Sequence, residues 1–202
     1  YIVSYIQQQC KKNFSRKAMK FIMGIFGNIT MYDILVQGAG IIGITASILS
    51  FQCKSHKPLT LLRTANEMFF AVQYFFLGAY TGAAMNLIGS LRNFVFIKMV
   101  EQNKSTKKMC FVFSALFLIF VAFTWEGPKS IIIGIAKVVS TFAYGNRQTA
   151  YIRILILLTS LSWFFYNLLV KSYAGCICEA LTGISIIAGI IRIDILGKMR
   201  KA

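Results

Sequence analysis

Five side chains able to bind or hold a ligand occur inside stretches of the chain that are otherwise strongly apolar. They are Asn86, Glu179, Lys137, Trp163 and Tyr74. An ionisable group costs about 2.5–3.5 kcal/mol at the centre of a membrane helix, so a carboxylate and a lysine there need partners or a ligand. Lys137 could neutralise Glu179 or bind an anionic substrate, and the two aromatic rings could wall a pocket. We predict that these residues bind a substrate; the simpler alternatives are hydrogen bonds between helices, a lysine that extends to the membrane surface, and rings that face lipid.

A second set of polar residues lies in the same apolar stretches, and for these we predict structural or gating roles. The set comprises Arg63, Asn66, Glu67, Arg92, Asn93, Arg153 and Asn167. Arg63 and Glu67 are four residues apart, so on one helix they share a face and can form a salt bridge. We expect this pair to be an internal salt bridge near one end of its helix.

The sequence contains no residue pattern typical of a catalytic site, a metal site or a cofactor site. The chain has one histidine, His56, and five scattered cysteines without zinc-ligand spacing. The run Gly38–Gly43 matches the GxGxxG pattern of dinucleotide-binding proteins, but it lies within an apolar segment and lacks the strand and the acidic residue that this motif requires. Close packing of helices is the simpler account of these small residues. We therefore predict a protein that is not an enzyme and that holds no metal or cofactor.

The composition places the chain in a lipid bilayer. Of its 202 residues, 57% are hydrophobic and 14% are charged, and the mean hydropathy is +0.66. Soluble domains carry nearer 25% charged residues, and so short a chain cannot bury this much apolar surface without lipid. The net charge of +16 would suggest nucleic acid for a soluble protein. Because the cations lie between the apolar segments, we expect the bilayer as a partner and no nucleic acid.

Seven apolar segments have about the length that an α-helix needs to cross a bilayer. They cover roughly residues 31–51, 59–77, 81–99, 108–125, 130–144, 151–170 and 174–193. A crossing of about 30 Å takes roughly 20 residues, and the segment 130–144 is the shortest. The predicted fold class is therefore all-α: a polytopic membrane protein with about seven transmembrane helices.

Positive charge alternates between the loops and predicts an orientation. If the first segment begins outside, the inner loops and tail carry ten cations: Lys54, Lys57, Lys98, Lys104, Lys107, Lys108, Arg147, Lys198, Arg200 and Lys201. The outer loops carry only Lys129 and Lys171. Because cytoplasmic loops are enriched in lysine and arginine, we predict an N-terminus outside and a C-terminus inside.

The first thirty residues conflict with this orientation, because they would place five cations outside: Lys11, Lys12, Arg16, Lys17 and Lys20. The segment could be an amphipathic helix at the membrane surface, an eighth span near residues 18–31, or no part of the natural protein. We expect the last, with Met31 as the natural start.

An internal repeat is suggested by two similar turns. The residues of Gly78–Gly82 match those of Lys171–Gly175 in order, and further along Asn86 matches Glu179. Three helices per copy plus one linker helix would give both copies the same orientation, which is the parallel repeat of some transporters, with the site near the midplane on the axis between the copies. The predicted division is a basic N-terminal extension (1–30), a first three-helix repeat (31–99), a linker helix (100–127), a second three-helix repeat (128–195) and a basic tail (196–202).

The same stretches carry a family resemblance. The run LGAYTGAAMNLIGSLRNFVF over Leu77–Phe96, the SYAG of the second turn, Glu179 and the GIIRID run ending at Asp194 resemble the YgjV-like family of bacterial inner-membrane proteins, over about residues 31–194. That family looks like a relative of the small SWEET, PQ-loop and PnuC transporters. The resemblance implies a SWEET-like arrangement of three, one and three helices in the bacterial inner membrane. It also implies that Asn86 and Glu179 correspond to the polar residues that SWEET-like transporters place on helices 3 and 7.

Two functions are compatible with these observations. The first is a transporter or carrier of an unknown small molecule, with a midplane site between the two repeats. The resemblance to the SWEET-like transporters favours this function. The alternative is a non-transporting membrane receptor or scaffold that binds a partner or lipid. Either could act as a homo-oligomer.

Overall fold

The computed structural model describes residues 31–199, and over this range the chain is helical without strands. The seven main helices are α2 (Met31–Ser50), α3 (His56–Phe76), α4 (Tyr80–Glu101), α5 (Lys107–Phe123), α6 (Pro128–Tyr144), α7 (Thr149–Leu169) and α8 (Tyr173–Gly189). A π-helical turn, η1 (Ile190–Ile195), and a short helix, α9 (Leu196–Met199), follow α8. The prediction of an all-α chain is confirmed, and each predicted segment corresponds to one helix. The predictions for the first thirty residues lie outside the described range.

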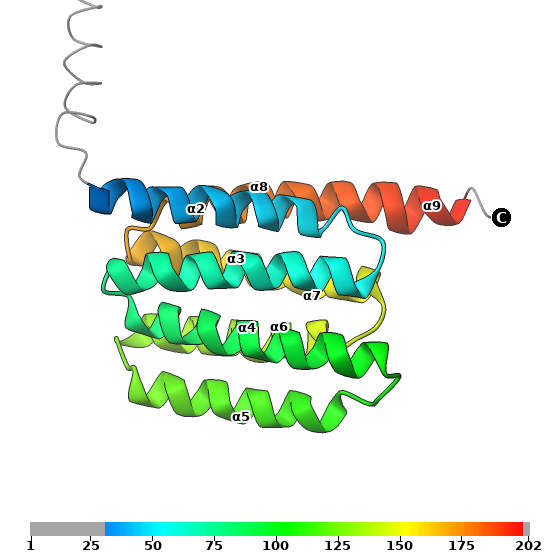
Figure 1. Cartoon of the computed structure of the whole chain (residues 1–202), viewed down its shortest axis with the longest axis horizontal. Coiled ribbons are helices and arrows are strands. Elements are labelled where there is room, and N and C mark those ends of the chain that lie inside the picture. The colour runs from blue at the N-terminus through cyan, green and yellow to red at the C-terminus, as the bar shows by residue number, and fades with distance from the viewer. Residues whose placement is uncertain (1–30, 200–202) are drawn as a thin grey trace, which may run out of the picture. The chain divides into compact units, whose positions relative to one another are not determined.

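From Val36 to Met199 the chain forms one compact unit in which each main helix runs antiparallel to the main helix before it (Figure 1). Within this unit α3 packs on α4, α7 packs on α6 and α8, and α5 packs against α4 and α6, which also touch each other. In Figure 1 three pairs of parallel helices overlap, α2 with α8, α3 with α7 and α4 with α6. Side-chain hydrogen bonds join each pair: Ser47 to Thr182, Tyr74 to Asn167, and Lys137 to Asn86. The space enclosed by α3, α4, α6, α7 and α8 is where the polar residues of the apolar segments meet.

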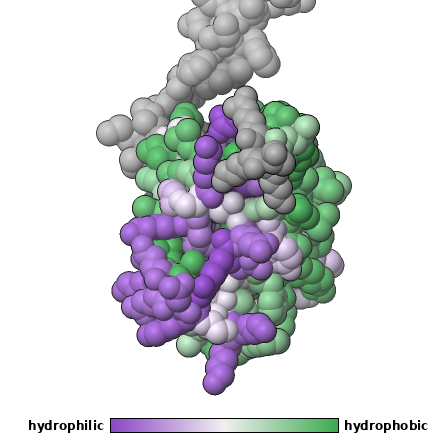
Figure 2. All heavy atoms as spheres, turned by 90° about the vertical axis from the view of Figure 1, so that its right-hand side faces the viewer, coloured by the Kyte–Doolittle hydropathy of each residue, from purple (hydrophilic) through white to green (hydrophobic). Residues whose placement is uncertain are grey.

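The helices bury many polar side chains beside an apolar core, and they expose many large apolar side chains. Arg92 and Arg153 have no exposed surface, whereas Phe123 is 83% exposed and Phe111 is 68% exposed. Large hydrophobic side chains cover the flanks of the molecule, and hydrophilic ones gather on the end that Figure 2 views. So many exposed large apolar side chains are unusual for a soluble protein and suit a surface that faces lipid.

Two helical stretches are long and apolar enough by composition to cross a membrane, Thr149–Leu169 and Tyr173–Ile195. Helices α3 to α6 differ from these two stretches for two reasons. α5 and α6 have 17 residues each, and α3 and α4 carry the charged side chains that point into the interior.

The glycines of the GxGxxG run lie where α2 approaches its neighbours. A Cβ on Gly43 would come within 2.8 Å of the Phe70 ring, and one on Gly40 would come within 3.0 Å of Ala174 and Gln73. These contacts agree with the predicted role of small residues in close helix packing.

The turns after α3 and α7 share one backbone geometry. Gly78 and Lys171 both lie in the left-handed region, with φ of +70° and +57°. In each turn the N–H of the next residue bonds, at 2.9 Å, to the carbonyl five residues before it. This is the Schellman ending of a helix, in which glycine is the usual left-handed residue. The two turns that the sequence comparison aligned therefore agree in conformation.

Lys171 occupies a position that favours glycine, so Lys171→Gly should raise the melting temperature of the full chain in detergent. The left-handed backbone conformation costs a residue with a Cβ atom about 1–2 kcal/mol of stability, and glycine avoids this cost. At the matched position, Gly78→Ala should lower the melting temperature, because alanine would take on that cost. Lys171→Ala is the control for loss of the charged side chain. A melting temperature for Lys171→Gly no higher than for Lys171→Ala would contradict the expectation.

Candidate functional site

A small polar cavity lies between α3, α4, α6, α7 and α8. All five residues predicted to bind a substrate line it: Tyr74, Asn86, Lys137, Trp163 and Glu179. Four residues of the predicted structural or gating set also line it: Arg63, Asn66, Glu67 and Asn167. The cavity has a volume of about 30 Å³, which is room for one or two water molecules. The fold thus brings together polar residues from both halves of the sequence.

Glu67 is the centre of the polar network. Its side chain is 4% exposed, and one carboxylate oxygen accepts from Lys137 Nζ at 2.8 Å and from Arg92 Nη2 at 3.2 Å. The other oxygen accepts from Asn93 Nδ2 at 3.3 Å. Lys137 also donates to Asn86 Oδ1 at 3.0 Å. One carboxylate on α3 therefore holds cations from α4 and α6.

The predicted salt bridge between Arg63 and Glu67 is wrong. Arg63 Nε donates to the Tyr144 hydroxyl at 2.8 Å, and its Nη1 donates to Ser47 Oγ at 2.6 Å. The physical reason is that neighbouring helices supply Glu67 with two closer cations, so the spacing within α3 does not decide its partner. Lys137, which could have neutralised Glu179, makes its ion pair with Glu67 instead.

Arg92 supports Glu67 from behind the cavity and does not line it. Its Nη1 donates to Ser140 Oγ and Thr141 Oγ1, both at 3.1 Å, and its Nε and Nη2 donate to Asn93 Oδ1. The guanidinium also lies 4.8 Å from the centroid of the Tyr144 ring, within cation–π range. Hydrogen bonds and a ring thus stabilise a charge that has no access to solvent.

Aromatic rings form one wall of the cavity. Tyr74 and Trp163 are stacked with centroids 6.3 Å apart, and Tyr166 meets both rings edge-on. The Tyr74 hydroxyl donates to Asn167 Oδ1 at 2.5 Å, which joins α3 to α7. Lys137 Nζ lies 5.1 Å from the Trp163 centroid, so the ring also faces a cation.

Glu179 differs from Glu67 in having no ion pair within 4.0 Å among residues 31–199. It is half-buried and lines the cavity together with Ser160, Arg63 and Lys137. Glu179 is therefore the carboxylate of the cavity that remains available to a ligand or a proton.

The buried charges at the cavity do not cancel. Three cations, Arg63, Arg92 and Lys137, surround two carboxylates, Glu67 and Glu179. The formal excess of one positive charge favours an additional anion at this position.

Arg153, a member of the predicted structural set, lies away from the cavity at the end where α2 joins α3. It forms an ion pair with Asp194 at 2.8 Å and donates to the carbonyls of Phe51 and Cys53. It thereby joins α7 to η1 and to the α2–α3 turn.

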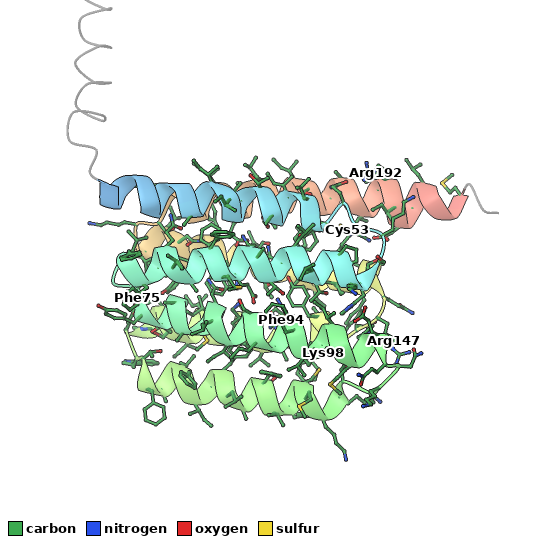
Figure 3. The ribbon with its side chains drawn as sticks, in the orientation of Figure 1. Cys53, Phe75, Phe94, Lys98, Arg147 and Arg192 are labelled. Carbon is green, nitrogen blue, oxygen red and sulfur yellow. The ribbon has the colours of Figure 1, made fainter. Side chains whose placement is uncertain are left out.

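Burial raises the pKa of the Cys53 thiol, and the positive charge of Arg153 opposes this effect. Figure 3 labels Cys53 at this end of the molecule, with Arg192 nearby.

The sequence analysis missed Gly89, which makes room for the ion pair. A Cβ at this position would overlap the Glu67 carboxylate and come within 2.8 Å of Lys137 Nζ. Helical spacing could have identified Gly89 from the sequence, since Asn86, Gly89 and Asn93 fall on one face of α4. Ser140, Tyr144 and Ser160 were also missed, because serine and tyrosine in apolar helices are too common to single out.

Glu67→Gln should lower the free energy of unfolding of the full chain in detergent by about 3–5 kcal/mol, because it leaves two buried cations without a counter-charge. Glu101→Gln is the matched control, since Glu101 pairs with Lys57 on the surface, where both side chains are well exposed. That substitution should cost less than about 1 kcal/mol. Equal losses in the two variants would show that the buried network does not hold the fold.

The family comparison identifies the membrane in which such a chain resides. A family model described as Imp-YgjV, bacterial inner membrane protein, matches residues 34–196. No curated protein and no solved structure matches the chain significantly.

Proposed function

The chain belongs to the Imp-YgjV family of bacterial inner membrane proteins, and from this premise we propose that it is a multi-pass carrier of a small polar solute. The observation that carries the proposal is the cavity, which is lined by charged and polar side chains inside helices whose outer faces are apolar. Intramembrane ionisable residues that meet at one place typically mark a solute or ion pathway. The proposal involves no catalytic step, cofactor, metal or nucleic acid.

In the proposed topology all seven main helices cross the membrane, with the N-terminus outside and the C-terminus in the cytoplasm. The charges of α3 and α4 have partners in the interior, so they do not oppose insertion. The 17 residues of α5 and α6 lie at the lower limit for a span. The turns α2–α3, α4–α5 and α6–α7 lie at one end of the molecule (Figure 1) and carry most loop cations, which supports a cytoplasmic location for this end.

The proposed architecture is a parallel repeat, with α2–α4 and α6–α8 as copies and α5 as the linker. The matched offset of the left-handed residues Gly78 and Lys171 supports it, although α4 ends with the same turn geometry at Asn103. Tyr74 and Asn167 are separated by the same offset as these turns, and their side chains bond to each other. Residues at equivalent positions meet in this way when an axis of pseudo-symmetry passes between them.

We favour an anionic solute, such as a carboxylate or a phosphate ester, because the charges at the cavity leave one positive charge uncompensated. Asn86 and Glu179 would contact its neutral polar groups, Lys137 its anionic group, and Tyr74 and Trp163 its apolar part. The cavity holds little more than a water molecule, so a carrier of this kind must separate its helices to admit the solute.

Thermal unfolding of the full chain in detergent tests the proposal against a panel of carboxylates, phosphate esters, amino acids, sugars, nucleosides and vitamins. A ligand at about 100 times its Kd should add roughly 2.7 kcal/mol to the stability, which is a measurable shift. The shift should vanish in Asn86→Ala and in Glu179→Ala and persist in Glu101→Ala, which removes a surface carboxylate. The active compound should then accumulate in vesicles that contain the protein.

The second candidate is a receptor or scaffold that does not transport. The small volume of the cavity and the complete pairing of Glu67 favour it, since both are also expected of a polar core that only locks helices together. If no compound of the panel raised the melting temperature of well-folded protein, the conclusion would shift to this function. Binding of a compound that does not then accumulate in the vesicles would have the same consequence.

Within the carrier function, Glu179 is the candidate proton carrier, because Glu67 is held by two cations. Glu179 is coupled electrostatically to Arg63, Lys137, Tyr74 and Cys178, and Ser160 lines the cavity with it. Glu179→Gln should remove the pH dependence of solute uptake between pH 5 and 8 while leaving the chain folded. Unchanged pH dependence in this variant would exclude Glu179 from the coupling.

A further inference from the structure

A second, open cleft lies at the end of the molecule proposed to face the cytoplasm. It has a volume of about 590 Å³ and lies between the α4–α5 turn and the α6–α7 turn. It is separate from the central cavity and shares no lining residue with it. The proposed carrier function makes no use of it.

The polar part of the cleft is positively charged. Lys104, Lys107 and Arg147 line it, and no acidic residue does. Arg147 donates to Asn103 Oδ1 at 2.8 Å and to the Lys104 carbonyl, which are neutral acceptors. α5 begins at Lys107 without a side-chain cap, so the positive end of its helix dipole adds to the field. The cleft is thus suited to an anion.

The other part of the cleft is aromatic and faces outward. Phe111 is 68% exposed and Phe142 is 38% exposed, and their rings meet edge-on with centroids 5.6 Å apart. Tyr151, 42% exposed, lies at the start of α7 in the same cleft. In a membrane protein such rings, next to a charged helix end, lie where headgroups meet acyl chains. Figure 2 views this end of the molecule, where hydrophilic side chains gather beside hydrophobic flanks.

We propose that this cleft binds an anionic phospholipid of the cytoplasmic leaflet. Lys104, Lys107 and Arg147 hold the phosphate, and the acyl chains follow Phe111 and Phe142 along the outer faces of α5 and α6. The ligand must be both anionic and amphipathic to match the two parts of the cleft. A soluble anion would use only the cations, and a basic pocket between membrane helices at this depth selects acidic headgroups.

Native mass spectrometry of the full chain in detergent micelles tests the proposal, with phosphatidylglycerol and with phosphatidylcholine of the same acyl chains. One phosphatidylglycerol should bind at least tenfold more tightly than phosphatidylcholine. The triple variant Lys104→Gln, Lys107→Gln, Arg147→Gln should weaken that binding at least tenfold, because each cation contributes to headgroup attraction. These side chains are exposed, so the variant should melt like the parent without lipid.

A matched control separates the cleft from general charge. The triple variant Lys54→Gln, Lys98→Gln, Lys108→Gln removes the same charge from exposed positions that do not line the cleft, and it should bind phosphatidylglycerol within about twofold of the parent. Equal weakening in the two triple variants, or equal binding of the two lipids, would overturn the proposal. Displacement of phosphatidylglycerol by millimolar inorganic phosphate would overturn it as well, because the site would then be one for a soluble anion.

Discussion

The need to pair a buried carboxylate with cations determines how the centre of this molecule is built. Glu67 meets Lys137 at 2.8 Å and Arg92 at 3.2 Å, and all three side chains are almost completely buried. Lipid cannot solvate any of them, so each must find its partner within the protein. Gly89 leaves the space in which they meet. A shift of one residue along α3, α4 or α6 would separate the charges, so this interaction fixes the register of three helices and the walls of the cavity.

The cations at the helix ends obey a different constraint. Arg147 has only neutral acceptors, and among the described residues Lys104 and Lys107 form no ion pair with a carboxylate. Water and lipid headgroups are available there, so these charges need no internal partner. The same scarcity of acidic residues that makes one carboxylate serve two interior cations leaves Lys104, Lys107 and Arg147 without an acidic partner among residues 31–199, which is what the proposed orientation and the proposed lipid site require. Charge therefore has two roles in one sequence: buried charges pair within the protein, and exposed charges gather at the helix ends.

The sequence predicted the helices and the residues of the cavity but not the pairing among them. Polar residues in apolar helices can avoid lipid only by facing one another, so Asn86, Glu179 and Lys137 were expected to converge. Spacing within one helix suggested a bridge from Arg63 to Glu67, and it failed because cations on α4 and α6 lie closer, which depends on how the helices rotate against each other. Gly89 was missed because its function is to leave space for groups on other helices. The cleft between the α4–α5 and α6–α7 turns was missed because its residues lie in two turns distant in sequence.

The size of the cavity shows what the proposed carrier function demands of the fold. A bound solute usually occupies 300–1,000 Å³, whereas the cavity has about 30 Å³. The contacts that would have to part lie in two places. Toward the α3–α4 and α7–α8 turns, the Tyr74–Asn167 bond and the stacked rings join α3 to α7. Toward the other end, Arg63 joins α3 to Tyr144 of α6 and to Ser47 of α2. The Glu67 network lies between them and costs most to break, because its charges would be left unpaired. Helices that open at one end at a time would keep this network intact as the pivot, so alternating access demands less of this fold than simultaneous opening at both ends.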